Sequence, residues 1–161
     1  MRCFVGVPLP EKVQQLLHEA RLGYLRVPAR MNHVAPDNLH VTLHFLGDDV
    51  SNVAKVKESL SEVDFEPFKA SVKDLGFFKQ GPYIRTIYTP VSKGKSQLIS
   101  LHDSVLKVLS ESVDKRFNPH VTLTRVKFVK STNKLSRACH EVHFEHEFLV
   151  DSFNLYSSVL T

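Results

Sequence analysis

The sequence predicts an α+β fold with two similar halves around a central cleft. The string His40-Val41-Thr42-Leu43 recurs eighty positions later as His120-Val121-Thr122-Leu123. Segments with strand-like alternation and segments with helical spacing also follow one another twice, in the order strand, helix, strand. A length of 161 residues with 42% hydrophobic content suffices for an ordinary core. We therefore expect one domain over residues 1–161, made of two pseudo-symmetric βαβ-containing lobes that each supply one repeated string.

The first half begins with a buried strand at residues 1–8. Pro10-Glu11 then opens a helix of about four turns, whose apolar positions recur at helical spacing from Val13 to Tyr24. The turn-prone string Pro36-Asp37-Asn38 introduces a strand over residues 39–47. Helically spaced valines and leucine then predict a second helix, and a half-exposed strand follows it. These two elements lie within residues 50–63 and 68–73.

The second half repeats this order. Gly81-Pro82 predicts a turn before a strand at residues 84–88. Apolar positions from Leu98 to Val113 predict a third helix, which ends before Asn118-Pro119 and the second repeated string. Residues 148–160 are rich in β-forming side chains and predict one long final strand.

Each repeated string presents a His and a Thr on one strand face, because side chains alternate with period two. Two such strands side by side would bring two imidazoles and two hydroxyls to one pocket. Two imidazoles are the minimum for paired general acid and base catalysis near neutral pH. The alternation also predicts that His44 shares the polar face of His40. Arg125 falls on the opposite face from His120 unless the strand bends or bulges.

The net charge of +4 is unevenly distributed, since residues 115–140 hold seven Lys and Arg residues and no Asp or Glu. This stretch would attract a phosphate-bearing ligand toward the second repeated string, and a solvated basic loop is the alternative. No run reaches the roughly 18 apolar residues of a membrane span, and the start is too short for a signal peptide. Cys3 and Cys139 fit a reducing compartment, so we expect a cytoplasmic protein.

Two further patterns were weighed for metal and nucleotide binding. The string His140-x-x-His143-x-x-His146 invites a zinc interpretation, but it lacks a helical i, i+4 pair and any accompanying Cys or carboxylate pattern. The six glycines are scattered and form no phosphate-binding loop, which disfavours a nucleotide-energised ligase. We expect neither a metal nor a cofactor.

Four strings in order resemble the 2H phosphoesterase superfamily, and within it the LigT-like RNA 2′,3′-cyclic phosphodiesterases, historically called 2′-5′ RNA ligases. They are MRCFVGV with a following LP at residues 1–10, PDNLHVTLHFLG at 36–47, FNPHVTLTRV at 117–126 and FNLYSSVLT at 153–161. The resemblance covers nearly the whole chain. It implies a bilobal fold with antiparallel sheets, in which the two His-x-Thr motifs face each other across the cleft.

The resemblance implies metal-independent opening of a 2′,3′-cyclic phosphate at an RNA end to a 2′-phosphate. In that reaction His40 is the proton donor and His120 the proton acceptor. The implied and candidate substrate contacts are Thr42, Thr122 and Arg125, then His44 beside the donor, and Phe4 and Tyr156 as stacking surfaces for the terminal base.

Two other functions stay open at this point. The same histidines could serve a 2′-5′ RNA ligase or another 2′-5′ or cyclic nucleotide phosphodiesterase, and a noncatalytic module could bind RNA ends. The expected partner is an RNA or oligonucleotide end bearing a cyclic phosphate, without a membrane and with a monomer as the working oligomeric state. The family usually continues past residues 157–161 with a Gly-Pro turn and a last strand, so we expect an exposed sheet edge.

Overall fold

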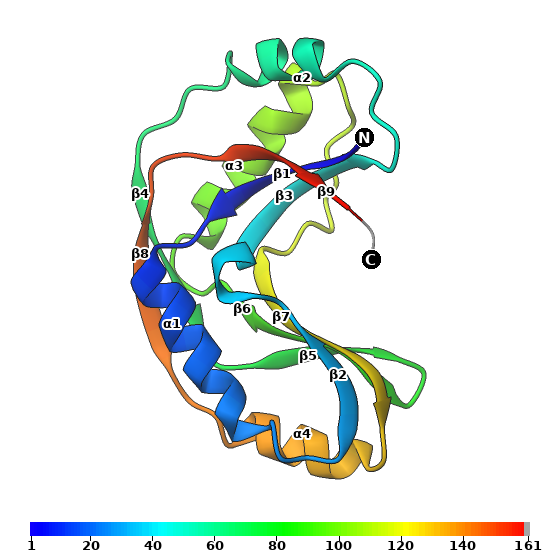
Figure 1. Ribbon diagram of the computed structural model, residues 1–161. Helices are drawn as coiled ribbons and strands as arrows, with labels where there is room; N and C mark the ends of the chain where they lie inside the picture. The colour runs from blue at the N-terminus through cyan, green and yellow to red at the C-terminus, as the bar shows by residue number, and fades with distance from the viewer. Residues whose placement is uncertain (160–161) are drawn as a thin grey trace.

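The computed structural model describes residues 1–159 and is an α+β structure, as predicted (Figure 1). In chain order its helices and strands are β1 (Arg2–Pro8), α1 (Glu11–Ala20), β2 (Ala29–His33), β3 (His40–Gly47), α2 (Val53–Leu60), β4 (Phe68–Lys73), β5 (Gly76–Gln80), β6 (Tyr83–Pro90), α3 (Lys95–Val108), β7 (His120–Val129), α4 (Thr132–His140), β8 (Glu145–Val150) and β9 (Asn154–Ser158). Among residues 1–159, no helix is long and apolar enough to cross a membrane.

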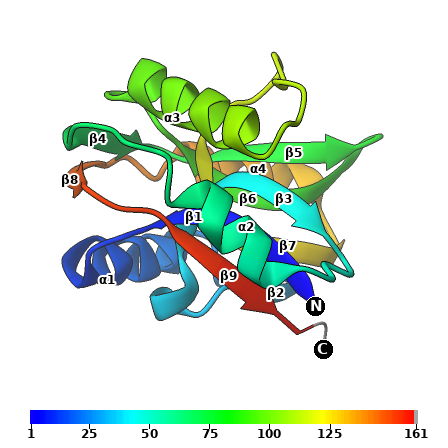
Figure 2. The ribbon, with the colours of Figure 1, turned by 90° about the horizontal axis from the view of Figure 1, so that it is seen from above.

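A seven-stranded antiparallel sheet carries both repeated strings. Its strand order is β5-β6-β7-β3-β1-β9, and β2 also pairs with β7. We call β1, β3 and β9 the first half-sheet, and β2, β5, β6 and β7 the second half-sheet. Strands β4 and β8 form a separate two-stranded ribbon, which Figure 2 shows to one side of the large sheet. The two repeated strings therefore lie on the central neighbours β3 and β7.

A single residue pair, Val41 with Val121, joins the two half-sheets. Both valines are fully buried and belong to a hydrophobic core that also holds Val13 and Leu17 of α1 and Leu98 of α3. The apolar positions of the repeated strings thus anchor the strands from one side of the sheet, which leaves their polar positions on the other side.

A second hydrophobic core stabilises the far end of the second half-sheet. Ile84 and Ile87 of β6 and Val126 of β7 pack there with Leu135 of α4. Helix α4 lies beyond this end of the sheet in Figure 1, whereas α2 and α3 lie at the opposite end. Each half-sheet therefore has its own helical support.

Three elements were not predicted, namely β2, β5 and α4. Strand β2 has the sequence ARMNH, which shows no apolar alternation and is ordered by its pairing with β7. Helix α4 lies within the basic stretch, is capped by the Ser131 side chain, which accepts from Lys134 N at 3.2 Å, and buries Leu135 and Cys139 one turn apart. Short or strongly polar elements show little hydrophobic periodicity in the sequence. Their contacts with the rest of the fold therefore determine whether they form a strand or a helix.

The predicted final strand over residues 148–160 is wrong as one element. Strand β8 ends at Val150 and pairs with β4, while β9 begins at Asn154 and pairs with β1. The chain passes from one sheet to the other between these strands. A composition rich in β-forming residues does not reveal where one strand ends and the next begins. Leu160 and Thr161, which belong to this prediction and to the last family string, lie outside the described residues.

The two half-sheets also differ from the predicted halves of the chain. Strand β2 comes from the first third of the sequence but pairs with β7, and β9 comes from the end but pairs with β1. Segments far apart in sequence therefore complete each half-sheet, because strand pairing and not chain order assigns an element to a sheet.

Candidate active site

The two repeated strings meet antiparallel, centred on Val41 and Val121. In this register His40 lies across from Thr122, and Thr42 lies across from His120. The four polar side chains are partly buried, whereas the two valines between them are completely buried on the other face. The structure thus brings together the four residues that the repeat singled out.

Both imidazoles are oriented by the same backbone contact. The His40 Nδ1 lies 2.6 Å from the Asn38 carbonyl oxygen, and the His120 Nδ1 lies 2.8 Å from the Asn118 carbonyl oxygen. A carbonyl oxygen only accepts, so each Nδ1 carries the hydrogen and each Nε2 is left for other partners. The His40 Nε2 lies 3.0 Å from Thr42 Oγ1. The backbone carbonyl of the Asn two residues before each His therefore fixes the same tautomer in both rings.

Each histidine lies against a pair of aromatic rings from the neighbouring strands. Phe4 stacks on His40 at 4.8 Å between ring centroids, and Tyr156 stacks on Phe4 at 4.9 Å. This places both predicted aromatic residues beside His40. On the other side, the rings of Phe78 and Tyr88 contact His120 edge-on, at 5.3 and 5.2 Å.

The sequence alone did not indicate Phe78 and Tyr88 as neighbours of His120. Tyr88 falls within the predicted strand of residues 84–88, but its neighbour in space, Phe78, lies on β5, which was not predicted. Tyr88 pairs with Thr122 across the β6–β7 ladder, so its side chain shares the face of the motif. The available signal was the spacing of Thr86 and Tyr88, which puts polar and aromatic groups on one face of β6.

Gly6 makes the surroundings of the two histidines unequal. It pairs with Thr42, at the place where Tyr88 pairs with Thr122 in the other half-sheet. A Cβ on Gly6 would lie 3.2 Å from His40 Cδ2 and 3.3 Å from Tyr156 Cε2. The missing side chain therefore lets the His40 ring lie close against β1.

The environment of His40 lowers its pKa below the ordinary histidine value. Burial is the largest cause, because it penalises the charged imidazolium. The hydrogen bond to the Asn38 carbonyl acts in the opposite direction, and the positive charges of Arg125 and His120 lower the pKa further.

Both motif strands bulge at the leucine of the repeat. In the β1–β3 ladder the partners are Gly6 with Thr42 and then Val5 with His44, so Leu43 is passed over. In the β6–β7 ladder Tyr88 pairs with Thr122 and Ile87 with Thr124, so Leu123 is passed over. A bulge reverses the alternation of faces for the residues that follow it.

The bulge at Leu123 brings Arg125 to the face of His120, which is the condition that the sequence analysis set for it. Arg125 is exposed and pairs with Thr86 of β6 and Asn32 of β2. At the equivalent place in the first half-sheet, Phe45 is 43% exposed and pairs with Phe4. Strict alternation along residues 39–47 would put Phe45 on the apolar face with Val41 and Leu43, and the bulge at Leu43 reverses this.

The predicted location of His44 on the polar face is wrong, for the same reason. His44 pairs with Val5, a core residue of β1, and therefore points away from His40. Its Nε2 lies 2.5 Å from the Glu111 carboxylate, just beyond the end of α3. His44 nevertheless lines the pocket that Thr42 and His120 also line, so its predicted role as a substrate contact stays a prediction.

Groups outside the ladders hold both bulges in place. The carbonyl oxygen of Leu43 accepts from Nδ1 of the buried His102 at 2.6 Å, and the carbonyl oxygen of Leu123 accepts from the Val34 backbone N–H at 2.9 Å. Behind β7, the hydroxyl of Thr124 contacts the Tyr24 hydroxyl at 2.6 Å. The bulges are thus specified by dedicated hydrogen bonds rather than being local irregularities.

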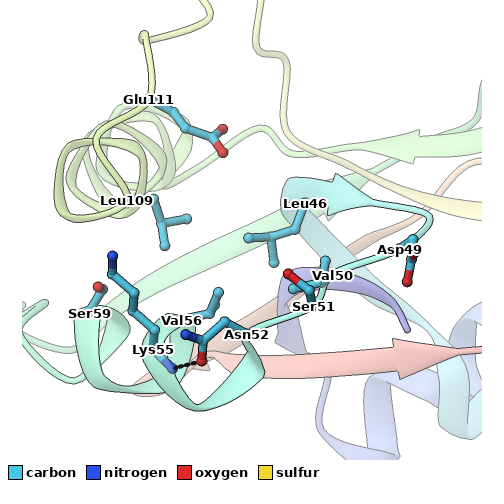
Figure 3. Close-up of a pocket in the computed structure, with 10 residues that line it drawn as sticks. All are labelled: Leu46, Asp49, Val50, Ser51, Asn52, Lys55, Val56, Ser59, Leu109 and Glu111. Carbon is cyan, nitrogen blue, oxygen red and sulfur yellow. Dashed lines mark hydrogen bonds between the residues drawn. The ribbon is translucent and has the colours of Figure 1, made fainter.

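A pocket of about 360 Å³ reaches from Thr42 to His120. Its wall includes the stacked rings of His102 and Phe117, whose centroids lie 3.9 Å apart. A second pocket of the same volume lies between the end of β3, helix α2 and the residues after α3 (Figure 3). Its ten lining residues contain no histidine, and Glu111 points toward it from the chain beyond α3.

The three histidines weighed for zinc lie on different elements. His140 ends α4, His143 follows in the loop, and His146 lies on β8. Within residues 1–159, no group of three or more His, Cys, Asp and Glu side chains is arranged to hold a metal ion.

The family model of the 2′-5′ RNA ligase superfamily matches residues 8–160. A protein named RNA 2′,3′-cyclic phosphodiesterase from Archaeoglobus fulgidus is 36% identical, and the match covers 100% of this chain and 93% of the relative. A protein of the same name from Aquifex aeolicus is 34% identical, with 100% and 90% covered.

Solved structures have the same fold. TT0787 of Thermus thermophilus superposes with a TM-score of 0.81 at 25% identity, covering 100% of this chain and 90% of that one. Escherichia coli LigT complexed with 3′-AMP gives a TM-score of 0.73 at 23% identity, with 99% and 89% covered.

Proposed function

The chain belongs to the 2′-5′ RNA ligase superfamily, and on that premise we propose that it hydrolyses RNA 2′,3′-cyclic phosphodiester ends to 2′-phosphomonoesters without a metal. The observation that supports this most is the pair of histidines on one sheet face, each with its Nδ1 held by a backbone carbonyl oxygen, which leaves Nε2 as the nitrogen for proton transfer; in His40 this nitrogen lies beside Thr42 Oγ1. Residues 1–161 would form one 2H phosphoesterase domain of two lobes, with His40 from one and His120 from the other.

Two histidines in opposite protonation states would run the reaction. His120 Nε2 takes a proton from a water molecule as the water oxygen bonds to phosphorus. The bond between phosphorus and the ribose 3′ oxygen then breaks, and the leaving oxygen takes the proton of His40 Nε2. The acid is needed because an alkoxide is a poor leaving group. The product keeps its phosphate on the 2′ oxygen.

Hydroxyls and one guanidinium would stabilise charge on the nonbridging phosphate oxygens. Thr42 and Thr122 donate from the face that bears the two histidines, and Arg125 reaches the same face through the bulge at Leu123. Phe4 and Tyr156 form the stacked surface on which the terminal base would lie.

The lowered pKa of His40 is compatible with its role as the acid once substrate is bound. In the free protein, burial and the positive charge of Arg125 disfavour the imidazolium. A bound phosphate brings a negative charge next to the ring and raises the pKa of His40, because an opposite charge favours the charged form. Substrate binding and protonation of the acid are therefore coupled.

The test is release of 2′-phosphate from an RNA that ends in a 2′,3′-cyclic phosphate, measured in the presence of EDTA. His40→Ala and His120→Ala should each lower kcat about 10²-fold to 10⁴-fold, the usual contribution of a general acid or base. His143→Ala is the matched control, since His143 is largely exposed and lies in the loop before β8. Undiminished activity in both motif variants would refute the proposal.

Joining of RNA ends is a second candidate, because the matching family model is described as a 2′-5′ RNA ligase superfamily. In this reaction His120 would take the proton from a ribose hydroxyl in place of water as that oxygen bonds to phosphorus, and His40 would again protonate the leaving 3′ oxygen. Analysis of products from a mixture of cyclic-phosphate and hydroxyl RNA ends separates joining from hydrolysis.

A further inference from the structure

The second half-sheet carries an unusual excess of positive charge. Strands β2, β5, β6 and β7 together contain five Arg and Lys residues and no Asp or Glu. None of the ion pairs among residues 1–159 involves Arg30, Arg85 or Arg125. The first half-sheet differs, because its single arginine, Arg2, is paired with Asp48. The free cationic charge thus lies on one side of the histidine pair.

The ladders place several of these residues on the same face as the histidines. Arg125 pairs with Asn32 of β2, and Arg30 lies two positions before Asn32, so it shares that face. Arg30 in turn pairs with Phe128, whose ring is 58% exposed. The face that begins at His120 therefore continues along β7 to Arg30 and Phe128.

A third arginine and an aromatic ring border this surface on β6. The Arg85 guanidinium lies over the Tyr83 ring at 5.4 Å and donates to the Lys127 carbonyl oxygen at 2.9 Å. Tyr83 is 52% exposed. Exposed aromatic rings between cationic groups are the usual means of holding single-stranded nucleic acid, because bases stack and phosphates are neutralised.

The surface is long enough for several nucleotides. Eight residue steps separate His120 from Phe128, which corresponds to about 26 Å along an extended strand. A cyclic phosphate occupies the 3′ terminus of an RNA, so the rest of the chain leaves the catalytic site in one direction only.

We propose that the RNA upstream of the cyclic phosphate lies along the second half-sheet, with phosphates at Arg85 and Arg30 and a base on Phe128. This inference rests on the proposed function, since it takes the histidine pair as the place of the RNA terminus. It makes a short oligonucleotide, and not a mononucleotide, the preferred substrate class.

The experiment compares cytidine 2′,3′-cyclic phosphate with a pentanucleotide that ends in the same group. Wild type should show a higher kcat/KM for the pentanucleotide. The double variant Arg30→Glu/Phe128→Ala should lose about tenfold in kcat/KM on the pentanucleotide, as expected for one lost base stack, and nothing on the mononucleotide. The matched control is Arg137→Glu, which reverses an exposed arginine on α4, behind the sheet.

Equal kcat/KM for the two substrates in wild type would overturn the proposal, as would an equal loss from Arg137→Glu. Absence of any turnover by wild type would refute the proposed function instead. Binding of the pentanucleotide would then test whether RNA lies along the second half-sheet. Fluorescence anisotropy with a labelled pentanucleotide should show a salt dependence of log K that is shallower by about 0.7 or more in the double variant. A slope equal to that of wild type would contradict binding of RNA along the second half-sheet.

Discussion

Replacing Gly6 by alanine tests the geometry of the site without removing a functional group. The new Cβ would lie 3.1 Å from the Val41 carbonyl oxygen, 3.2 Å from His40 Cδ2 and 3.3 Å from Tyr156 Cε2. Ordinary carbon contacts lie at about 3.5–4.0 Å, so the His40 ring must move by about 0.4 Å. A misplacement of about 1 Å costs about 10²-fold in rate, so we expect Gly6→Ala to lose about five- to tenfold in kcat/KM.

Stability should change little by comparison. Overpacking costs about 1–3 kcal/mol, and the smaller conformational entropy of the unfolded alanine chain offsets about 0.4–1 kcal/mol of it. The assay is cyclic-phosphate hydrolysis under conditions in which both variants are fully folded. Urea unfolding is measured in parallel to establish this. Gly81→Ala is the control, because Gly81 has a φ of +59° with no atom within 4 Å of its added Cβ.

The control should lose stability through backbone strain and keep its activity. An unchanged kcat/KM in Gly6→Ala would refute the argument that the bare backbone at this position sets the place of His40. A loss that merely follows the unfolded fraction would refute it equally.

Three further predictions concern the neighbours of the motif. Arg125→Gln removes a charge that lowers the pKa of His40, so the alkaline limb of the kcat/KM pH profile, where the acid is lost, should move to higher pH; a limb that stays in place or moves down contradicts this. His44→Ala should retain activity, because the side chain shares the face of Val5 and is paired with Glu111, and it should lose at most about 1 kcal/mol in urea unfolding; a large drop in kcat would support a role for His44 as a substrate contact from the pocket wall. His102→Phe keeps the ring but leaves the buried Leu43 carbonyl oxygen without its donor, so it should lose about 1 kcal/mol of stability and part of kcat; a urea midpoint at or above that of wild type would argue against this anchoring.

The repeat was informative because it combined two constraints at each position. Val41 and Val121 had to be buried, and the His and Thr on either side of each valine had to lie on the opposite face of the sheet. Alternation alone therefore located the polar face. The same rule failed three and four residues later, at His44 and Phe45. A bulge is stabilised by groups remote in sequence, here His102 and Val34, and leaves no periodic signal of its own.

The aromatic surroundings of His120 were missed for a related reason. Phe78 contacts this histidine from β5, whose register depends on pairing with β6. A five-residue strand at a sheet edge has too few positions to show a period. By contrast, Phe4 and Tyr156 belonged to strings already associated with the family, and the structure stacks them beside His40.

The paired bulges give the molecule a directional preference that its repeated letters conceal. Five residues after each histidine the chain presents a different side chain to the same face, a phenyl ring at Phe45 and a guanidinium at Arg125. The Phe45 ring lies under the guanidinium of Arg2, whose charge is paired with Asp48, whereas Arg125 forms no ion pair within residues 1–159. An anionic group that approaches the motif is therefore attracted to the Arg125 side, which distinguishes the two ends of the site for a ligand with one anionic end.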